Sequence, residues 1–90
     1  MNNLSDQQIV AVQDILIEEL GIKREQLATE ARLMEDLGAD SIESVEIAMR
    51  VEDQFGITIP DEEMERIVNV GDLLEILGEK LNRSVQSGAK

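Results

Sequence analysis

One serine is the residue in this sequence best suited to carry a chemical modification. It follows an aspartate and precedes a run in which apolar residues recur at helical spacing. Asp40 and Glu43 have the spacing of a capping box, which predicts that a helix begins at Ser41 with Asp40 as its N-cap. A helix N-terminus presents unpaired N–H groups and roughly half a positive charge, so it favours an anion such as a phosphodiester on Ser41. The pattern predicts an exposed hydroxyl suited to such a modification; the alternative is an ordinary helix cap.

The same hydroxyl lacks the partners of a catalytic nucleophile. The chain contains no His and no Cys, and no Gly-x-Ser-x-Gly turn surrounds the serine. These absences exclude Ser-His-Asp and Cys-His catalytic groups, disulfides and Cys/His zinc sites. A calcium loop aligned at Asp36 also fails, because Ser41 stands where Gly is needed and Ile47 where a bidentate Glu is needed. We therefore expect no catalysis by this chain alone and no metal site.

The helix that Ser41 begins is expected to run over residues 41–55, since Gly56 follows in the position favoured for a C-terminal cap. At about 100° per residue, two apolar stripes lie on opposite sides of this helix. The inward stripe contains Ile47, Ala48, Val51 and Phe55. The outward stripe contains Ile42, Val45 and Met49, with Glu46, Glu52 and Asp53 beside it. The outward stripe predicts a surface for a basic partner with an apolar socket, unless neighbouring helices bury both stripes.

Other helices must surround this one. A capping box at Ser5 and Gln8 predicts a helix near residues 5–20, acidic residues after Pro60 predict a short helix at 61–66, and the pair Asn69 and Asp72 predicts the start of another. The stretch 22–40 has no helical or strand period, and it is predicted to be a long loop whose apolar residues Leu27, Leu33, Met34 and Leu37 lie on the core. The fold class is therefore an all-α four-helix bundle, with three longer helices and one short helix. We expect one small domain at 1–83 and a disordered tail at 84–90.

Charge and hydropathy restrict the partners. The net charge is −12, and residues 30–66 hold 12 of the 20 acidic residues. Such a surface repels the phosphate backbone of nucleic acids. No apolar run approaches the roughly 20 residues that span a bilayer, and the first residues lack the plan of a signal peptide. The expectation is a soluble, cytoplasmic, monomeric protein that neither binds nucleic acid nor inserts into a membrane.

The sequence strongly resembles acyl carrier proteins, whose attachment motif is usually written Asp-Ser-Leu. The resemblance lies in Gly38-Ala39-Asp40-Ser41-Ile42, in the flanking Glu35-Asp36-Leu37 and Val45-Glu46-Ile47, and in Phe55-Gly56-Ile57-Thr58-Ile59-Pro60-Asp61-Glu62-Glu63. It extends over about residues 4 to 81 and therefore covers the whole domain.

The resemblance implies a serine, here Ser41, esterified by 4′-phosphopantetheine, with Asp40 assisting recognition by the phosphopantetheinyl transferase. Acyl groups would be held as thioesters on the thiol of this arm and delivered to acyl-transfer and chain-elongation enzymes with basic docking patches. It implies acidic contacts at Glu43, Glu46, Glu52 and Asp53 and apolar contacts at Ile42, Val45 and Met49. It also implies an acyl pocket lined by Phe55, Ile59, Ile67 and Leu73, for which plain core packing is the alternative.

Two departures from the family pattern point to a specialised carrier. Ile42 stands where the family usually has Leu, and Arg50 places a positive charge beside Glu43 and Glu46 where small or apolar residues are common. A carrier of fatty-acid, polyketide or related lipid biosynthesis is the leading interpretation. An unmodified acidic helical module that docks a basic helix is the alternative.

Overall fold

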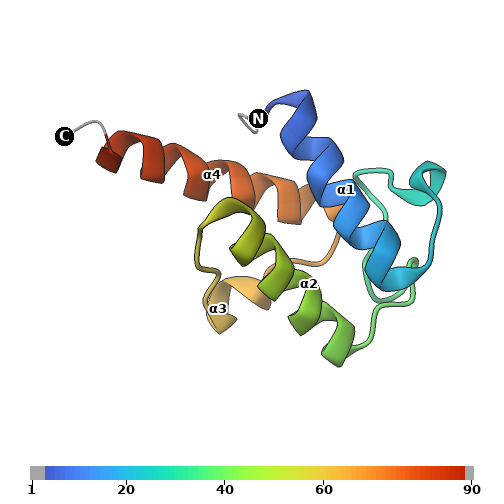
Figure 1. Ribbon diagram of the computed structural model, residues 1–90. Coiled ribbons are helices and arrows are strands. Elements are labelled where there is room, and N and C mark those ends of the chain that lie inside the picture. Colours follow the sequence, from blue (N-terminus) through green and yellow to red (C-terminus); the bar gives the residue numbers. More distant parts are fainter. Residues whose placement is uncertain (1–3, 89–90) are drawn as a thin grey trace.

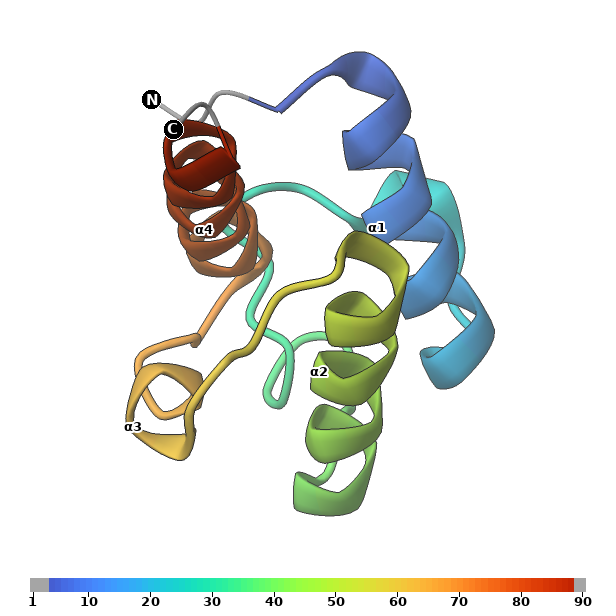
Figure 2. The same cartoon turned by 60° about the vertical axis from the view of Figure 1, so that its left-hand side comes forward.

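Residues 4–88 fold into four α-helices joined by one long and two short connections. The computed structural model describes residues 4–88, and the side chains of residues 4–81. Its helices are α1 (Asp6–Leu20), α2 (Ser41–Phe55), α3 (Asp61–Met64) and α4 (Val70–Gly88), with a 3-10 turn, η1, at Arg24–Gln26. α1 and α2 pack side by side and antiparallel, and α3 lies on the far side of α2 from α1 (Figure 1, Figure 2). The predicted fold class, with three longer helices and a short one, is confirmed.

Both longer helices of the first half are capped at their N-termini. The Ser5 hydroxyl accepts the Gln8 N–H at 3.2 Å, and the Gln8 side chain accepts the Ser5 N–H at 2.9 Å. α2 ends at Gly56, whose φ of 67° is the left-handed conformation that glycine adopts most readily, and whose N–H donates to the Glu52 carbonyl at 2.8 Å. The bounds predicted for both helices therefore agree with the structure to within one residue.

The core receives side chains from α1, the long loop, α2, the segment after α2, and α4. The hydrophobic effect drives this assembly, since none of the described buried residues is polar or charged. The residues that are almost fully enclosed are Val12, Leu16, Val51, Val70, Leu73 and Leu77. The inward stripe of α2 therefore faces this core as predicted: Ile47, Ala48 and Val51 are buried, and Phe55 packs against them while partly exposed.

The loop over residues 22–40 lies on the core and is bonded to the start of α4. The Val70 N–H donates to the Ala31 carbonyl at 3.0 Å, and the Leu33 N–H donates to the Val68 carbonyl at 2.9 Å. At Gly71 a Cβ atom would lie 3.1 Å from the Thr29 carbonyl oxygen, so glycine allows the two backbones to approach closely here. Leu27, Leu33 and Leu37 are buried as expected.

Met34 departs from that expectation. Its side chain is 58% exposed, because this part of the loop turns around the Arg32–Asp36 contacts and faces outward. The prediction that Met34 lies on the core was therefore wrong.

The last two helices differ from prediction in length. α3 ends at Met64, two residues before the predicted end, and α4 is helical through Gly88, where a tail from residue 84 was expected. The predicted cap pair of α4 is present: the Asn69 side chain accepts the Asp72 N–H at 2.7 Å. The side chains of residues 82–88 and all of 89–90 lie outside the described part, so the division into a domain at 1–83 and a tail stays a prediction. Among residues 4–88, no helix is both long and apolar enough to cross a membrane.

Candidate functional site

Ser41 is exposed at the first position of α2. Asp40 and Glu43 form the predicted capping box: the Glu43 N–H donates to Asp40 Oδ1 at 2.8 Å, and the Asp40 N–H donates to Glu43 Oε1 at 3.2 Å. The N–H groups of Ser41 and Ile42 have no acceptor within the helix, because their partners would lie before its start. The Ser41 hydroxyl therefore stands in the positive field of a well-formed helix N-terminus.

The approach of the chain to Ser41 is fixed by the loop before it. Ala39 is buried, and its N–H donates to the Leu33 carbonyl at 2.9 Å, while Gly38 turns the backbone with a φ of 78°. After this left-handed turn the chain passes from the buried Ala39 to the exposed Asp40 and Ser41.

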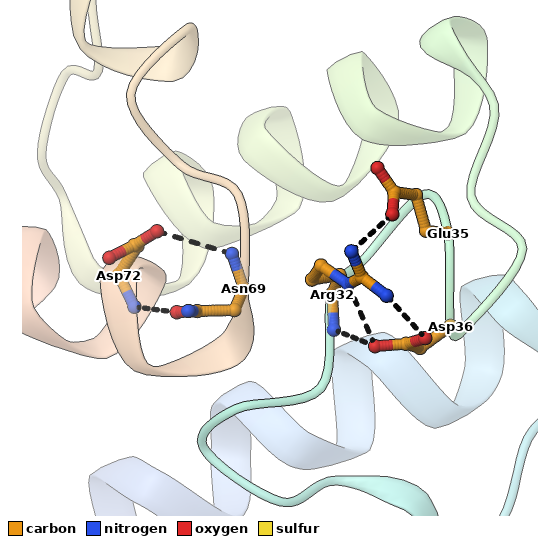
Figure 3. Close-up of polar contacts among 5 residues, drawn as sticks. All are labelled: Arg32, Glu35, Asp36, Asn69 and Asp72. Carbon is orange, nitrogen blue, oxygen red and sulfur yellow. Dashed lines mark hydrogen bonds and ion pairs between the residues drawn. The ribbon is translucent and has the colours of Figure 1, made fainter.

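Arg32 holds the same loop together through two acids, Glu35 and Asp36 (Figure 3). The Arg32 N–H donates to Asp36 Oδ2 at 2.9 Å, and its Nε lies 3.2 Å from the same oxygen. These bonds, first that from the backbone and then that from the side chain, lower the pKa of Asp36 below its ordinary value. The Asn69–Asp72 cap lies beyond this cluster in Figure 3, at the start of α4.

A cavity of about 380 Å³ opens beside Ser41. The loop, α2 and the chain between α3 and α4 supply its walls, and the surface inside is mainly apolar. Its lining comprises Arg32, Leu33, Met34, Glu35, Ser41, Ser44, Val45, Ile47, Ala48, Met64, Glu65, Ile67, Val68 and Leu73. An exposed hydroxyl and an apolar cavity thus occupy one place on the molecule.

The structure brings together only part of the expected acyl pocket. Ile67 and Leu73 line the cavity. Phe55 and Ile59 do not line it; Ile59 is buried in the core and Phe55 packs against the core from the C-terminal end of α2, the end far from Ser41. Leu33 and Met64 line the cavity and were not selected from the sequence, because neither loop position nor a four-residue helix carries a periodic signal.

The outward stripe of α2 is exposed. Ile42, Val45 and Met49 have 69%, 48% and 56% of their surface accessible. Two further exposed apolar side chains, Met34 from the loop and Val68 from before α4, line the cavity together with Val45. We call these five residues the apolar face. Because isolated apolar residues are common on surfaces but a group around a cavity mouth is not, this face is a candidate contact surface.

The four acids predicted to border this stripe are not equivalent. Glu46 and Asp53 are exposed, whereas Glu43 is occupied in the capping box. Glu52 is partly buried, and its Oε2 accepts the Ile59 N–H at 2.7 Å. Glu52 therefore has a structural task, holding the chain that leaves α2, which sequence spacing did not indicate.

Arg50 contacts α1, although the sequence had placed it beside Glu43 and Glu46. Its Nη2 lies 2.7 Å from Glu18 Oε1 and its Nη1 lies 3.0 Å from Glu19 Oε2. The hydrogen bonds to Glu18 and Glu19 raise the pKa of Arg50 above its ordinary value.

Glu46, one turn earlier in α2, faces Glu19 of α1. Its protonated carboxyl can donate a hydrogen bond to Glu19, and the two negative charges repel when both are ionised. For these two reasons, in that order, the pKa of Glu46 is raised above its ordinary value.

Among the described residues, no cluster of three or more acids is placed to hold a metal ion.

Comparisons with known proteins agree on one family. A family model described as the phosphopantetheine attachment site matches residues 10–85. The chain is 46% identical over 66 residues to the acyl carrier protein of Helicobacter acinonychis (strain Sheeba), a match that covers 73% of this chain and 85% of that protein. It is 44% identical over 66 residues to the acyl carrier protein of Helicobacter pylori (strain G27), with the same coverage of both chains.

The fold gives the same result. The solved structure of the acyl carrier protein from Enterococcus faecalis superposes on this chain with a TM-score of 0.73 and 29% sequence identity. The match covers 83% of this chain and 95% of that one.

Proposed function

This chain belongs to the acyl carrier protein family, and we propose that Ser41 is the residue on which it carries its arm. A covalently attached 4′-phosphopantetheine is the cofactor of this family. The observation that supports Ser41 is its place: an exposed hydroxyl at a capped helix N-terminus, beside an apolar cavity. Through its terminal thiol, the arm supplies a thioester linkage for an acyl group.

The residues around Ser41 fit such a group. A phosphodiester on the Ser41 oxygen would face the free N–H groups of Ser41 and Ile42, which stabilise an anion at this end of α2. The nearby cavity is large and apolar enough to take part of an aliphatic chain and keep it from water. Its lining includes Ile67 and Leu73, which we retain as acyl contacts, and adds Leu33 and Met64.

Asp40 has two tasks in this proposal. Through its bond to the Glu43 N–H it fixes the first turn of α2, and so the position of the Ser41 hydroxyl. Its remaining charge would contribute to recognition by the basic surface of a phosphopantetheinyl transferase. The chain has no His to accept the serine proton, so we assign that role to the transferase.

The apolar face and the acids beside it form the proposed docking surface for enzymes that load or extend the acyl group. Ile42, Val45 and Met49 would enter an apolar socket, and Glu46 and Asp53 would meet basic side chains around that socket. Glu43 and Glu52 would contribute through their charge while their carboxylates stay bonded within the chain. Docking that depends on exposed charges is rapid and reversible, which suits a protein that visits several enzymes in turn.

We further infer that the chain has no catalysis of its own and serves fatty-acid, polyketide or related lipid biosynthesis. Acyl groups bound as thioesters are common to these routes, and apolar side chains lining a cavity do not distinguish one aliphatic chain from another.

The attachment site is tested by intact mass. The purified chain is incubated with coenzyme A and a broad-specificity phosphopantetheinyl transferase, and the peptide that contains Ser41 is mapped. We expect one added phosphopantetheine on that peptide and none in Ser41→Ala, with Ser44→Ala as the matched control that keeps the modification. Modification of folded Ser41→Ala would refute the site, and an unmodified wild-type chain would favour the acidic interaction module.

The docking surface is tested by charge reversal. Glu46→Lys should slow association of the modified chain with a basic acyl-transfer enzyme severalfold at low salt, whereas Glu75→Lys, an exposed position on α4, should change it much less. Equal effects of the two variants would show that only net charge matters and would place recognition elsewhere.

A further inference from the structure

Residues 60–69, the later part of the chain between α2 and α4, cross one side of the cavity as a strap attached at both ends. Before it, the Ile59 N–H donates to Glu52 Oε2 at 2.7 Å, and the Ile59 side chain is buried. At its other end, the Val68 N–H donates to Asp72 Oδ2 at 3.0 Å, while the Val68 carbonyl accepts the Leu33 N–H. The strap is therefore fixed to α2 on one side and to α4 and the loop on the other.

The strap begins with α3, whose apolar contact with the core is made by the partly buried Met64. This helix is four residues long, none of its side chains is fully buried, and its N-cap, Pro60, provides no side-chain cap bond. A helix this short has little stability of its own, so its position depends on contacts with the rest of the chain. In Figure 2, α3 lies on the side of α2 that faces away from α1.

One ion pair connects α3 to α4. Lys80 Nζ lies 2.6 Å from Glu63 Oε1, and the two side chains are only 18% and 28% exposed. Glu63 Oε1 itself is buried, and no hydrogen bond to another group compensates it. Within the described residues, no other ion pair joins α3 to another helix. Loss of the ammonium would leave a buried carboxylate oxygen uncompensated, which favours movement of Glu63 toward water.

The pair lies next to the cavity wall. Met64, which follows Glu63, lines the cavity, as do Glu65, Ile67 and Val68 further along the strap. Movement of Glu63 away from α4 must carry Met64 with it, because Met64 shares the same helical turn. The cavity would then open on the α3 side, while its floor at Leu73, on α4, stays in place.

We propose that Lys80 is a positioning residue that latches α3 onto α4 and so sets how far the cavity opens. With the pair closed, the cavity has the volume seen here; with the pair open, a longer apolar chain can enter between α3 and α2. This inference rests on the proposed function only in assigning the cavity to an acyl chain. The latch itself is a property of the unmodified protein and can be tested there.

The test is amide hydrogen exchange on the full unmodified chain. Lys80→Met keeps the aliphatic stem and removes the charge, and Lys23→Met, in the loop before η1, is the control that removes the same charge elsewhere. In Lys80→Met we expect the N–H groups of residues 63–65, which bond to the Pro60 and Asp61 carbonyls, to exchange about fivefold faster. Exchange in α1 and α2 should stay as in the wild-type chain.

A second readout follows the cavity. The uncharged apolar dye Nile red should bind faster to Lys80→Met than to the wild-type chain or to Lys23→Met. The exchanged pair Glu63→Lys with Lys80→Glu should restore slow α3 exchange and slow dye entry. Unchanged α3 exchange, equal acceleration in every helix, or no rescue by the exchanged pair would each overturn the latch.

The outcome is independent of the attachment site. Lys80→Met should still accept phosphopantetheine on the Ser41 peptide, because Lys80 does not line the site. A failed latch with normal attachment leaves the carrier proposal intact, and a latch without attachment leaves a gated cavity of another use.

Discussion

The guanidinium of Arg50 lies 3.0 Å from the carboxylate of Glu19, across the contact between α2 and α1. The same guanidinium reaches Glu18 at 2.7 Å, so one cation on α2 joins two consecutive acids on α1. α2 carries both Ser41 and most of the apolar face. The contacts of Arg50 hold α2 against α1. The positive charge is thereby directed toward α1 and away from Ile42, Val45 and Met49.

Arg50→Met should destabilise the fold modestly. The substitution removes both ion pairs and leaves the acids on α1 without their cation, but all three side chains are partly exposed and screened by solvent. We expect a small decrease in the urea concentration at the unfolding midpoint. Arg66→Met, at an exposed position after α3, is the control for the lost charge. Equal losses in the two variants would contradict a specific α1–α2 contact.

Glu46→Gln should stabilise the protein at neutral pH. The folded-state pKa of Glu46 is raised above the ordinary value of 4.5, first by its hydrogen bond with Glu19 and then by repulsion from it. Stability linked to this group is therefore fully present below the ordinary value and is lost as the pH rises through the folded-state pKa.

The measurement is the melting temperature of Glu46→Gln and of Glu75→Gln at pH 7 and near pH 4. At pH 7 Glu46→Gln should melt higher than the control, because it removes repulsion from Glu19 as well as net charge. The advantage should shrink at the lower pH, where the wild-type carboxyl is protonated. A constant advantage at both values would show that the Glu19–Glu46 contact does not titrate.

Two substitutions at Asp40 distinguish its role as an N-cap from the role of its negative charge. Asp40→Ala removes the acceptor of the Glu43 N–H and should cost about 1 kcal/mol in unfolding free energy, whereas Asp40→Asn keeps an acceptor and should cost less. Both variants lose the charge that we assign to transferase recognition. Denaturant melts and the initial rate of Ser41 modification are measured together. Wild-type modification of stable Asp40→Asn would show that only the cap matters.

The two faces of α2 should respond differently to truncation. Val51 is fully enclosed, so Val51→Ala should lower the unfolding free energy by roughly 2 kcal/mol through lost burial and a cavity. Met49 is 56% exposed, so Met49→Ala should change stability by less than about 0.5 kcal/mol. Met49→Ala should instead weaken docking to an acyl-transfer enzyme. Comparable destabilisation by both would mean that Met49 also packs against the fold.

Local signals predicted the helices that carry caps. Ser5 with Gln8, Asp40 with Glu43 and Asn69 with Asp72 each specify an N-terminus within four residues of chain, so no knowledge of the tertiary fold is needed. The period of α2 likewise separates Val51 from Met49 correctly, because a single helix determines which side chains share a face.

Contacts between different helices and loops could not be predicted from these local sequence patterns. Arg50 appeared to be a neighbour of Glu43 and Glu46 on one helix, but the approach of α1 supplies Glu18 and Glu19 as nearer partners. Met34 lies in a stretch without period, so its outward direction depends on how the loop is folded. Leu33 and Met64 meet at the cavity only because the strap and the loop are brought together by the start of α4.

The bonds between the long loop and the start of α4 also determine the order of events during synthesis. α1 and α2 hold their own N-caps within a few residues of chain. The loop that aims Ser41 needs the backbone of Val68 and Val70 as partners, and these emerge later. The hydroxyl therefore takes its final place relative to the cavity only in a chain synthesised past the start of α4.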